Sequence, residues 1–231
     1  MLKTLISTAV LSAMAVTPLA AQDIEADAPP AQRSITDYAT IDYNLQEDRD
    51  NILLLDLSNG QRVAIRLMPD WAPNHVERIK TLARQGFYDG VIFHRVIDGF
   101  MAQTGDPTGT GQGGSELPDL EEEFNPMPHV RGTVSMARAQ SEDSANSQFF
   151  IVFYPRFSLD KKYTNFGRVI AGMDAVDAIV RGEPPSNPTR IVQASIASDN
   201  RPAPSPAQMA APAKTDARTM SVDELDAPIG E

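Results

Sequence analysis

Short runs of alternating apolar and polar residues fill the middle of the chain and predict mainly β structure. Residues 52–57 and 62–67 are two such runs, and the Asn59-Gly60 pair between them predicts a tight hairpin turn, because both residues tolerate a positive φ. Later strand-like runs cover residues 93–106, 132–139, 148–153 and 190–197, while residues 159–169 predict a turn followed by a strand. Successive side chains of a strand point to opposite faces, so each run presents one face to a core.

Two stretches with helical periodicity interrupt these strands. The first begins near Asp70, carries Pro73 in its first turn and is expected to stop at Gly86. Its apolar residues share one helical face: Val76, Ile79, Leu82 and Ala83. The second covers residues 173–181 and ends before two prolines. Many short strands with only two helices favour a closed barrel or a sandwich over a parallel sheet.

The two ends of the chain differ from this middle part. Residues 1–21 combine a positive start at Lys3, a short apolar run and small residues up to Ala21, which is the pattern of a cleavable signal peptide. The alternative is a membrane anchor, but the run is short for the roughly 20 residues that span a bilayer. We therefore expect export to the periplasm and no membrane span after cleavage.

Two flanking segments are expected to lie outside the main domain. Residues 22–46 are acidic and polar and predict a linker or a loosely attached arm, although residues 40–45 alternate, and the pattern leaves a short edge strand open. Residues 199–231 are rich in alanine and proline, end in an acidic stretch, and predict a disordered tail.

Composition narrows the classes of function. The chain has 231 residues, a formal net charge of −11 and no cysteine. Its acidity argues against nucleic acid as a partner, because phosphate binding needs basic patches. The lack of cysteine excludes disulfides and thiolate chemistry, and the three histidines show no ligand spacing, so we expect neither a metal nor a cofactor.

Residues 93–106 are the most informative segment. They begin as a buried strand and end in glycines, but Arg95 and Gln103 stand among aromatic and sulfur-containing side chains. A cation among apolar residues is costly without a partner, so this mixture indicates a site open to an extended peptide. The pattern alone leaves two alternatives open: a structural ion pair for Arg95, and a plain core for the neighbouring apolar residues.

Two other readings of nearby residues are disfavoured. The glycine-rich residues 108–114 lack the Gly-Lys-Ser/Thr ending of a phosphate-binding loop, so a shaped loop beside a site is the better interpretation. Ser147 and His94 suggest a hydrolase, but no Gly-x-Ser-x-Gly elbow surrounds the serine. His94 is instead expected to be packed and hydrogen-bonded.

Three blocks of the sequence resemble the cyclophilins, the peptidyl-prolyl cis–trans isomerases, over roughly residues 47–198. The blocks are Phe93-His94-Arg95-Val96-Ile97-x-Gly99-Phe100-Met101-x-Gln103-x-Gly105-Asp106, then residues 132–137 with 147–151, and Leu159-Asp160 with Tyr163-Thr164-x-Phe166-Gly167. The resemblance implies a closed eight-stranded antiparallel β-barrel capped by two α-helices, with the site on the outer face of the barrel. It also implies a monomer.

The resemblance also implies roles for particular residues. Arg95 takes the position of the catalytic arginine, and Gln103 that of a polar contact beside it. The apolar proline pocket falls to Phe100, Met101, Phe150, Leu159 and Phe166. The groove for the residues before proline falls to Ala137, Arg138, Ala139 and Gln148.

Three positions depart from the pattern of many relatives. Arg138 stands where asparagine is frequent, and a change in groove specificity is expected. Ser158 replaces the tryptophan that animal members use to bind cyclosporin, so weak cyclosporin binding is expected. Tyr163 replaces a histidine that lines the pocket in many eukaryotic members.

The predicted function is therefore isomerisation of X–Pro bonds in unfolded or partly folded proteins of the cell envelope. Arg95 would stabilise the twisted amide. The alternative is a non-catalytic module, or chaperone, that holds proline-containing segments in the same groove.

Overall fold

A computed structural model describes residues 34–210, and these form one antiparallel sheet with three α-helices. The strands are β1 (Ile52–Leu57), β2 (Arg62–Leu67), β3 (Arg95–Ile97), β4 (Met101–Thr104), β5 (Thr133–Met136), β6 (Phe149–Val152), β7 (Asn165–Ala171) and β8 (Ile191–Ile196). Their order in the sheet is β3-β4-β6-β5-β7-β2-β1-β8. The predicted hairpin is confirmed: β1 pairs with β2, and Gly60 has a φ of 84°.

The two predicted helices are present, and both cover the core. Helix α1 (Pro73–Arg84) begins at its proline, and α2 (Met173–Asp177) is shorter than predicted. The chain tightens after α2, where Ile179 N donates to Val176 O. Both helices bury apolar side chains in the interior cluster of the sheet. Among the described residues, no helix has the length and apolar character needed to cross a membrane.

Strand alternation separates an inner and an outer face in β3, β4, β5 and β6. Val96, Ala102, Val134 and Ile151 are paired across these strands and all belong to the interior cluster. Their neighbours one position along each strand point to the other face. A second, separate apolar cluster lies on that outer face.

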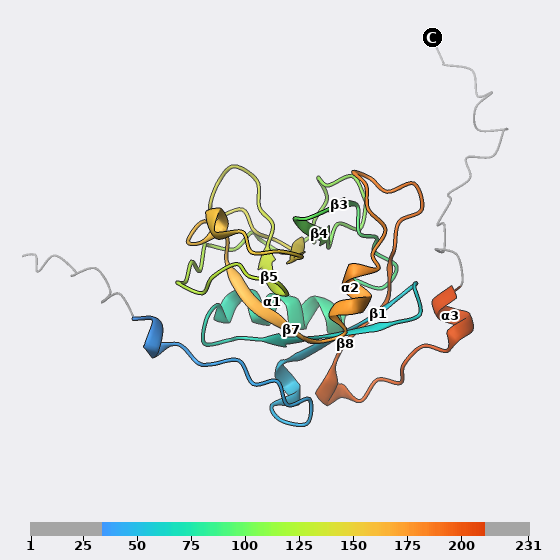
Figure 1. Cartoon of the computed structure of the whole chain (residues 1–231), viewed down its shortest axis with the longest axis horizontal. Helices are drawn as coiled ribbons and strands as arrows, with labels where there is room; N and C mark the ends of the chain where they lie inside the picture. The colour runs from blue at the N-terminus through green and yellow to red at the C-terminus, as the bar shows by residue number, and fades with distance from the viewer. Residues whose placement is uncertain (1–33, 211–231) are drawn as a thin grey trace, which may run out of the picture. The chain divides into compact units, whose positions relative to one another are not determined.

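The sheet formed by β1 to β8 does not close into a barrel, so the structure shows the predicted eight antiparallel strands without the predicted closure. The two edges are β3 and β8, and only short contacts join them. Isolated bridges pair Ile92 with Arg190 and Val96 with Gly182. In Figure 1, β3 and β4 lie in the upper part of the view and β1 and β8 below them. The arrangement is a half-barrel whose gap is spanned by irregular backbone.

The segment before β1 is tied to the sheet rather than loosely attached. The guanidinium of Arg66, on β2, is 2% exposed and donates to four backbone carbonyls of this arm: Asp42, Asn44, Glu47 and Asp48. Trp71 Nε1 also donates to Ala39 O at 2.9 Å. Residues 40–45 form no strand.

The start of the predicted disordered tail is also structured. Arg201 donates to Asp89 at 2.8 Å, and Gln193 donates to Pro202 O at 2.9 Å. Helix α3 (Pro206–Ala210) follows. The prediction of disorder was therefore wrong for residues 199–210. Hydrogen bonds hold this segment, although its composition offers few large apolar side chains. The remainder of the tail and the predicted signal peptide lie outside the described residues.

Candidate active site

Strand register places the predicted catalytic residues in one row across the outer face. Arg95 pairs with Gln103, Gln103 with Phe150, and Phe150 with Ser135. Directly opposite residues of antiparallel strands project to the same face. Gln103 and Phe150 thus become neighbours although 47 positions of sequence separate them, and Phe150 lies two strands away from Arg95.

An apolar cluster, which contains most of the predicted proline pocket, adjoins this row. Met101 and Phe150 are 1% and 4% exposed and pack with Val152. Partly buried side chains complete this outer cluster: Ile97, Phe100, Ala137, Leu159 and Tyr163. The structure therefore brings together four of the five residues predicted to hold proline, and two of them, Phe100 and Leu159, are only partly buried.

Phe166 is the exception, and its predicted role in the pocket was wrong. It is 0% exposed, belongs to the interior cluster and meets Phe149 edge to face at 6.2 Å. The register of β5 and β7 shifts between Val134 and Ser135, leaving Phe166 without an opposite residue. At this β-bulge, its side chain points into the core, where a peptide cannot reach it.

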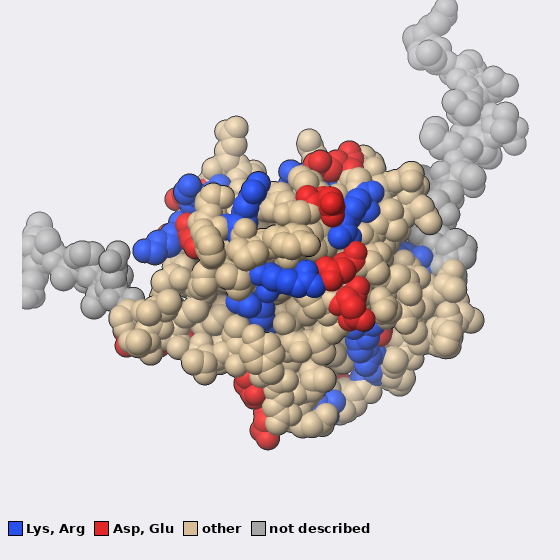
Figure 2. Space-filling view, in the orientation of Figure 1, with Lys and Arg blue, Asp and Glu red and all other residues tan. Residues whose placement is uncertain are grey.

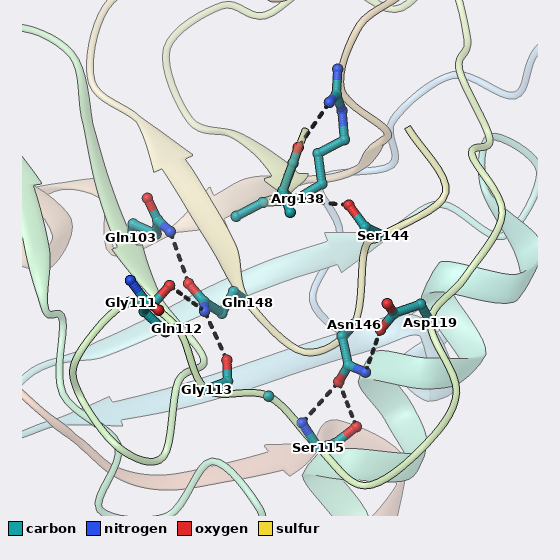
Figure 3. A pocket seen from close by; sticks show the side chains of 13 residues that line it. Gln103, Gly111, Gln112, Gly113, Ser115, Asp119, Arg138, Ser144, Asn146 and Gln148 are labelled. Atoms are coloured by element: carbon teal, nitrogen blue, oxygen red, sulfur yellow. Dashed lines mark hydrogen bonds between the residues drawn. The ribbon is translucent and has the colours of Figure 1, made fainter. Parts of the chain in front are cut away.

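A chain of hydrogen bonds runs in one direction along the polar side of the row. Arg95 Nη1 donates to Gln103 Oε1 at 3.4 Å, and Gln103 Nε2 donates to Gln148 Oε1 at 2.9 Å. Gln148 Nε2 then donates to the carbonyls of Gly111 and Gly113 at 3.1 and 2.8 Å (Figure 3). Each amide has its oxygen toward Arg95 and its nitrogen away from it, so Arg95 orients the side chains that line the neighbouring groove.

This groove has a volume of about 620 Å³ and continues the apolar pocket. It contains all four residues predicted to hold the segment before proline: Ala137, Arg138, Ala139 and Gln148. Ala137 belongs both to its lining and to the outer cluster. The groove and the outer cluster therefore meet at Ala137.

The glycine-rich loop forms the far wall of the groove and is fixed by Asp106. This side chain accepts hydrogen bonds from Thr108 N, Thr108 Oγ1 and Gly111 N. Burial by itself raises the pKa of Asp106, but these bonds and one from the Gly113 backbone lower it to about 2. The carboxylate stays ionised and holds the loop in place, which agrees with the predicted shaped loop.

The guanidinium of Arg138 is held by backbone carbonyl oxygens. It donates to Lys162 O at 3.0 and 3.1 Å, to Ala139 O and to Gln140 O. Its Cζ also lies 4.9 Å from the centre of the Tyr163 ring, and Tyr163 meets Phe150 edge to face at 5.7 Å. Two of the three departures from the family pattern, Arg138 and Tyr163, therefore pack together beside Phe150.

The supporting role of one buried histidine was missed by the sequence analysis. His129 is 1% exposed and stacks on Phe150 at 6.3 Å. Its Nδ1 lies 2.8 Å from Asp160 Oδ1, and its Nε2 lies 2.8 Å from Ser135 Oγ. Burial lowers the pKa of His129, while Asp160 opposes this effect. The three partners come from different elements, so no sequence spacing signals them.

His94 and Ser147 have structural environments. His94 is packed as predicted, but neither ring nitrogen has a hydrogen-bond partner within residues 34–210, so the predicted hydrogen bond was wrong. Burial lowers the pKa of His94. Ser147 is 0% exposed and donates to Gly105 O at 2.8 Å. Neither residue is arranged for nucleophilic catalysis.

An antiparallel half-barrel with two helices over its core, and an arginine beside an apolar pocket on its outer face, is the architecture of a cyclophilin. The family described as cyclophilin type peptidyl-prolyl cis-trans isomerase/CLD matches residues 53–196. The chain belongs to this family, and it is an enzyme of the peptidyl-prolyl cis–trans isomerase type.

Named relatives and solved structures agree with this assignment. A probable peptidyl-prolyl cis-trans isomerase of Brucella suis is 48% identical over 170 residues, covering 67% of this chain and 86% of the relative. Peptidyl-prolyl cis-trans isomerase B of Bacillus subtilis is 42% identical over 128 residues, covering 55% and 89%. The crystal structure of cyclophilin AquaCyp293 from Hirschia baltica has a TM-score of 0.62 at 32% identity, covering 67% and 77%.

Proposed function

We propose that Arg95 catalyses rotation about X–Pro bonds by stabilising the twisted amide while the outer cluster holds the proline ring. The observation that carries this proposal is the row Arg95–Gln103–Phe150, which puts a cation beside an open apolar pocket. A proline ring suits this pocket because it is apolar, compact and preceded by extended backbone.

The chemistry needs no bond to be made or broken. Rotation faces a barrier of roughly 18–20 kcal/mol because the planar amide loses its resonance. In the twisted state the proline nitrogen regains a lone pair, so a donor at that position binds the twisted state more tightly than either planar state.

Arg95 has the donors for this task. An arginine carries five N–H groups, and in the described part of the chain those of Arg95 bond only Glu183 and Gln103. Its side chain is 42% exposed, so the remaining donors are accessible from the outer face. Each 1.36 kcal/mol of differential stabilisation is worth about tenfold in rate. One hydrogen bond is too weak for the whole effect, so pocket and groove must share it by fixing the two sides of the bond.

The groove supplies that second point of attachment in this proposal. The exposed backbone and amide groups of Ala137–Ala139 and Gln148 would hold the residues before proline, while the pocket holds the ring. A related solved structure, a Cryptosporidium parvum cyclophilin at 28% identity and a TM-score of 0.58, was crystallised in the presence of the dipeptide Ala-Pro. We propose that such proline-containing segments are also the ligands here.

We further propose that the clients are unfolded or partly folded proteins of the periplasm. This rests on the signal-like pattern of residues 1–21. Cell fractionation with the full chain tests it: recovery of a shortened chain in the periplasmic fraction supports export, and a full-length chain in the cytoplasm overturns it.

A protease-coupled assay on a proline tetrapeptide tests the catalytic role. Wild type should exceed the uncatalysed rate, and Arg95→Ala should lose most of that excess while still binding the peptide in an NMR titration. If wild type binds the peptide but the peptide isomerises only at the uncatalysed rate, the protein is a binding module. If Arg95→Ala keeps full activity, Arg95 has no catalytic role.

A further inference from the structure

A carboxylate from a distant part of the chain contacts the catalytic arginine. Arg95 Nε donates to Glu183 Oε2 at 2.9 Å, across 88 positions of sequence. The side chains are 42% and 51% exposed, so solvent screens their charges. The contact therefore adds little to the stability of the fold, and its main effect is to orient the guanidinium of Arg95.

Backbone structure fixes Glu183 beside β3. Val96 N donates to Gly182 O at 2.8 Å, and Gly182 N donates to Val96 O at 2.9 Å. Gly182 has a φ of 144°, and a Cβ there would lie 2.6 Å from Pro185 Cα, so only glycine fits this turn. Glu183 is consequently held next to the strand that carries Arg95, within hydrogen-bonding distance of its guanidinium.

The contact decides which donors of Arg95 face the site. The guanidinium is planar, so holding Nε on one edge fixes the direction of both Nη groups. One Nη1 hydrogen is directed to Gln103 Oε1, on the pocket side. The remaining Nη hydrogens are the donors left to meet the proline nitrogen of a bound peptide. Glu183 is thus the first member of the chain that continues through Gln103 and Gln148 to the glycine-rich loop.

We propose that Glu183 is a positioning residue that orients Arg95 for isomerisation. This inference rests on the proposed function of Arg95 and adds a residue to it. Glu183 does not belong to the outer cluster or to the groove lining, so it acts through Arg95 and does not hold the peptide. Its removal should lower kcat and leave peptide affinity unchanged.

The test compares Glu183→Gln with Asp98→Asn in the full chain. Asp98 is a matched control because it also forms an ion pair, with Arg181 at 3.3 Å, and its loss changes the net charge equally. Glu183→Gln should lower kcat about fivefold, which corresponds to about 1 kcal/mol, with the peptide Kd within twofold of wild type. Asp98→Asn should match wild type in both quantities.

Two further measurements separate orientation from a general effect. In an Arg95→Lys background the additional change Glu183→Gln should have almost no effect on kcat, because lysine lacks the Nε donor. The ¹⁵N–¹H signal of Arg95 Nε should be resolved in wild type and move toward solvent-exposed arginines in Glu183→Gln.

The outcomes distinguish the two proposals. If wild type is active and Glu183→Gln retains its kcat, or becomes faster because Glu183 competes with substrate for Arg95, the positioning role is overturned while the function of Arg95 stands. If wild type itself shows only the uncatalysed rate, the proposed function fails and this role fails with it.

Discussion

Arg66 provides the sharpest test of how the arm before β1 is held. Its buried guanidinium makes four hydrogen bonds to arm carbonyls, at 2.9, 3.0, 2.9 and 2.7 Å. Arg66→Met keeps an unbranched apolar stem in a shorter side chain and removes all four bonds.

The expected cost follows from the environment of these carbonyls. Hydrogen bonds to charged groups contribute about 1.5–3 kcal/mol each, so four give an upper bound of about 6–12 kcal/mol. The carbonyls belong to exposed residues, so water replaces the lost donors, and the released arm regains conformational entropy. We therefore expect the free energy of unfolding to fall by about 3 kcal/mol.

Urea denaturation measures this change. With a slope of roughly 2 kcal/mol/M, the midpoint should fall by about 1.5 M. Arg84→Met is the control, because it removes an exposed arginine that pairs with Asp50 and Asp199, and exposed pairs are worth about 0.2–1 kcal/mol. Peptide isomerisation by the folded variant should be unchanged, since β2 lies three strands from β6. Equal midpoints for the two variants would refute the reasoning.

Other perturbations test the site and its support. Phe150→Leu should lower kcat/KM several-fold with little loss of stability, whereas Phe166→Leu should lower the free energy of unfolding by about 1 kcal/mol or more and leave kcat/KM of the folded protein intact. Chemical denaturation measures the stability of both variants, and the tetrapeptide assay measures their kcat/KM. Loss of kcat/KM in Phe166→Leu alone would reverse our assignment of the two residues. Burial lowers the pKa of His129 in the folded protein, so as the pH falls the unfolded chain takes up a proton at His129 before the folded protein does, and stability should decline below about pH 6.5. His129→Asn should therefore show a shallower decline of the urea midpoint between pH 7 and 5. The same decline in wild type and variant would contradict this role of His129. Ser158→Trp should tighten cyclosporin binding at least tenfold in a calorimetric titration, and unchanged affinity would show that this position does not limit it.

The surface charges of the molecule are mixed. Figure 2 shows acidic and basic side chains interspersed on the visible face. Exposed ion pairs such as Arg131 with Asp177 account for part of this pattern. In such places basic side chains balance the acidic ones, although the formal net charge of the chain is −11. The site itself contains a positive charge, that of Arg95.

Much of the site was accessible from sequence because strand periodicity is local. The alternation in residues 93–106 and 148–153 separates Arg95, Gln103 and Phe150 from the interior side chains beside them, and the structure confirms that separation. The family blocks then assigned these positions together. Phe166 was misplaced because a β-bulge changes the face of a side chain, and a bulge depends on the partner strand.

The sequence by itself determined the elements, the apolar faces and the family, since these follow from spacing within short segments and from motifs. Only the tertiary structure decided the half-barrel, the docking of the arm on Arg66, and the groups that support the site. Glu183 reaches Arg95 through a backbone bridge at Gly182, and His129 reaches Phe150 from a separate loop. Such contacts depend on strand register and chain closure over long sequence separations, and those distances are fixed only when the whole sheet has formed.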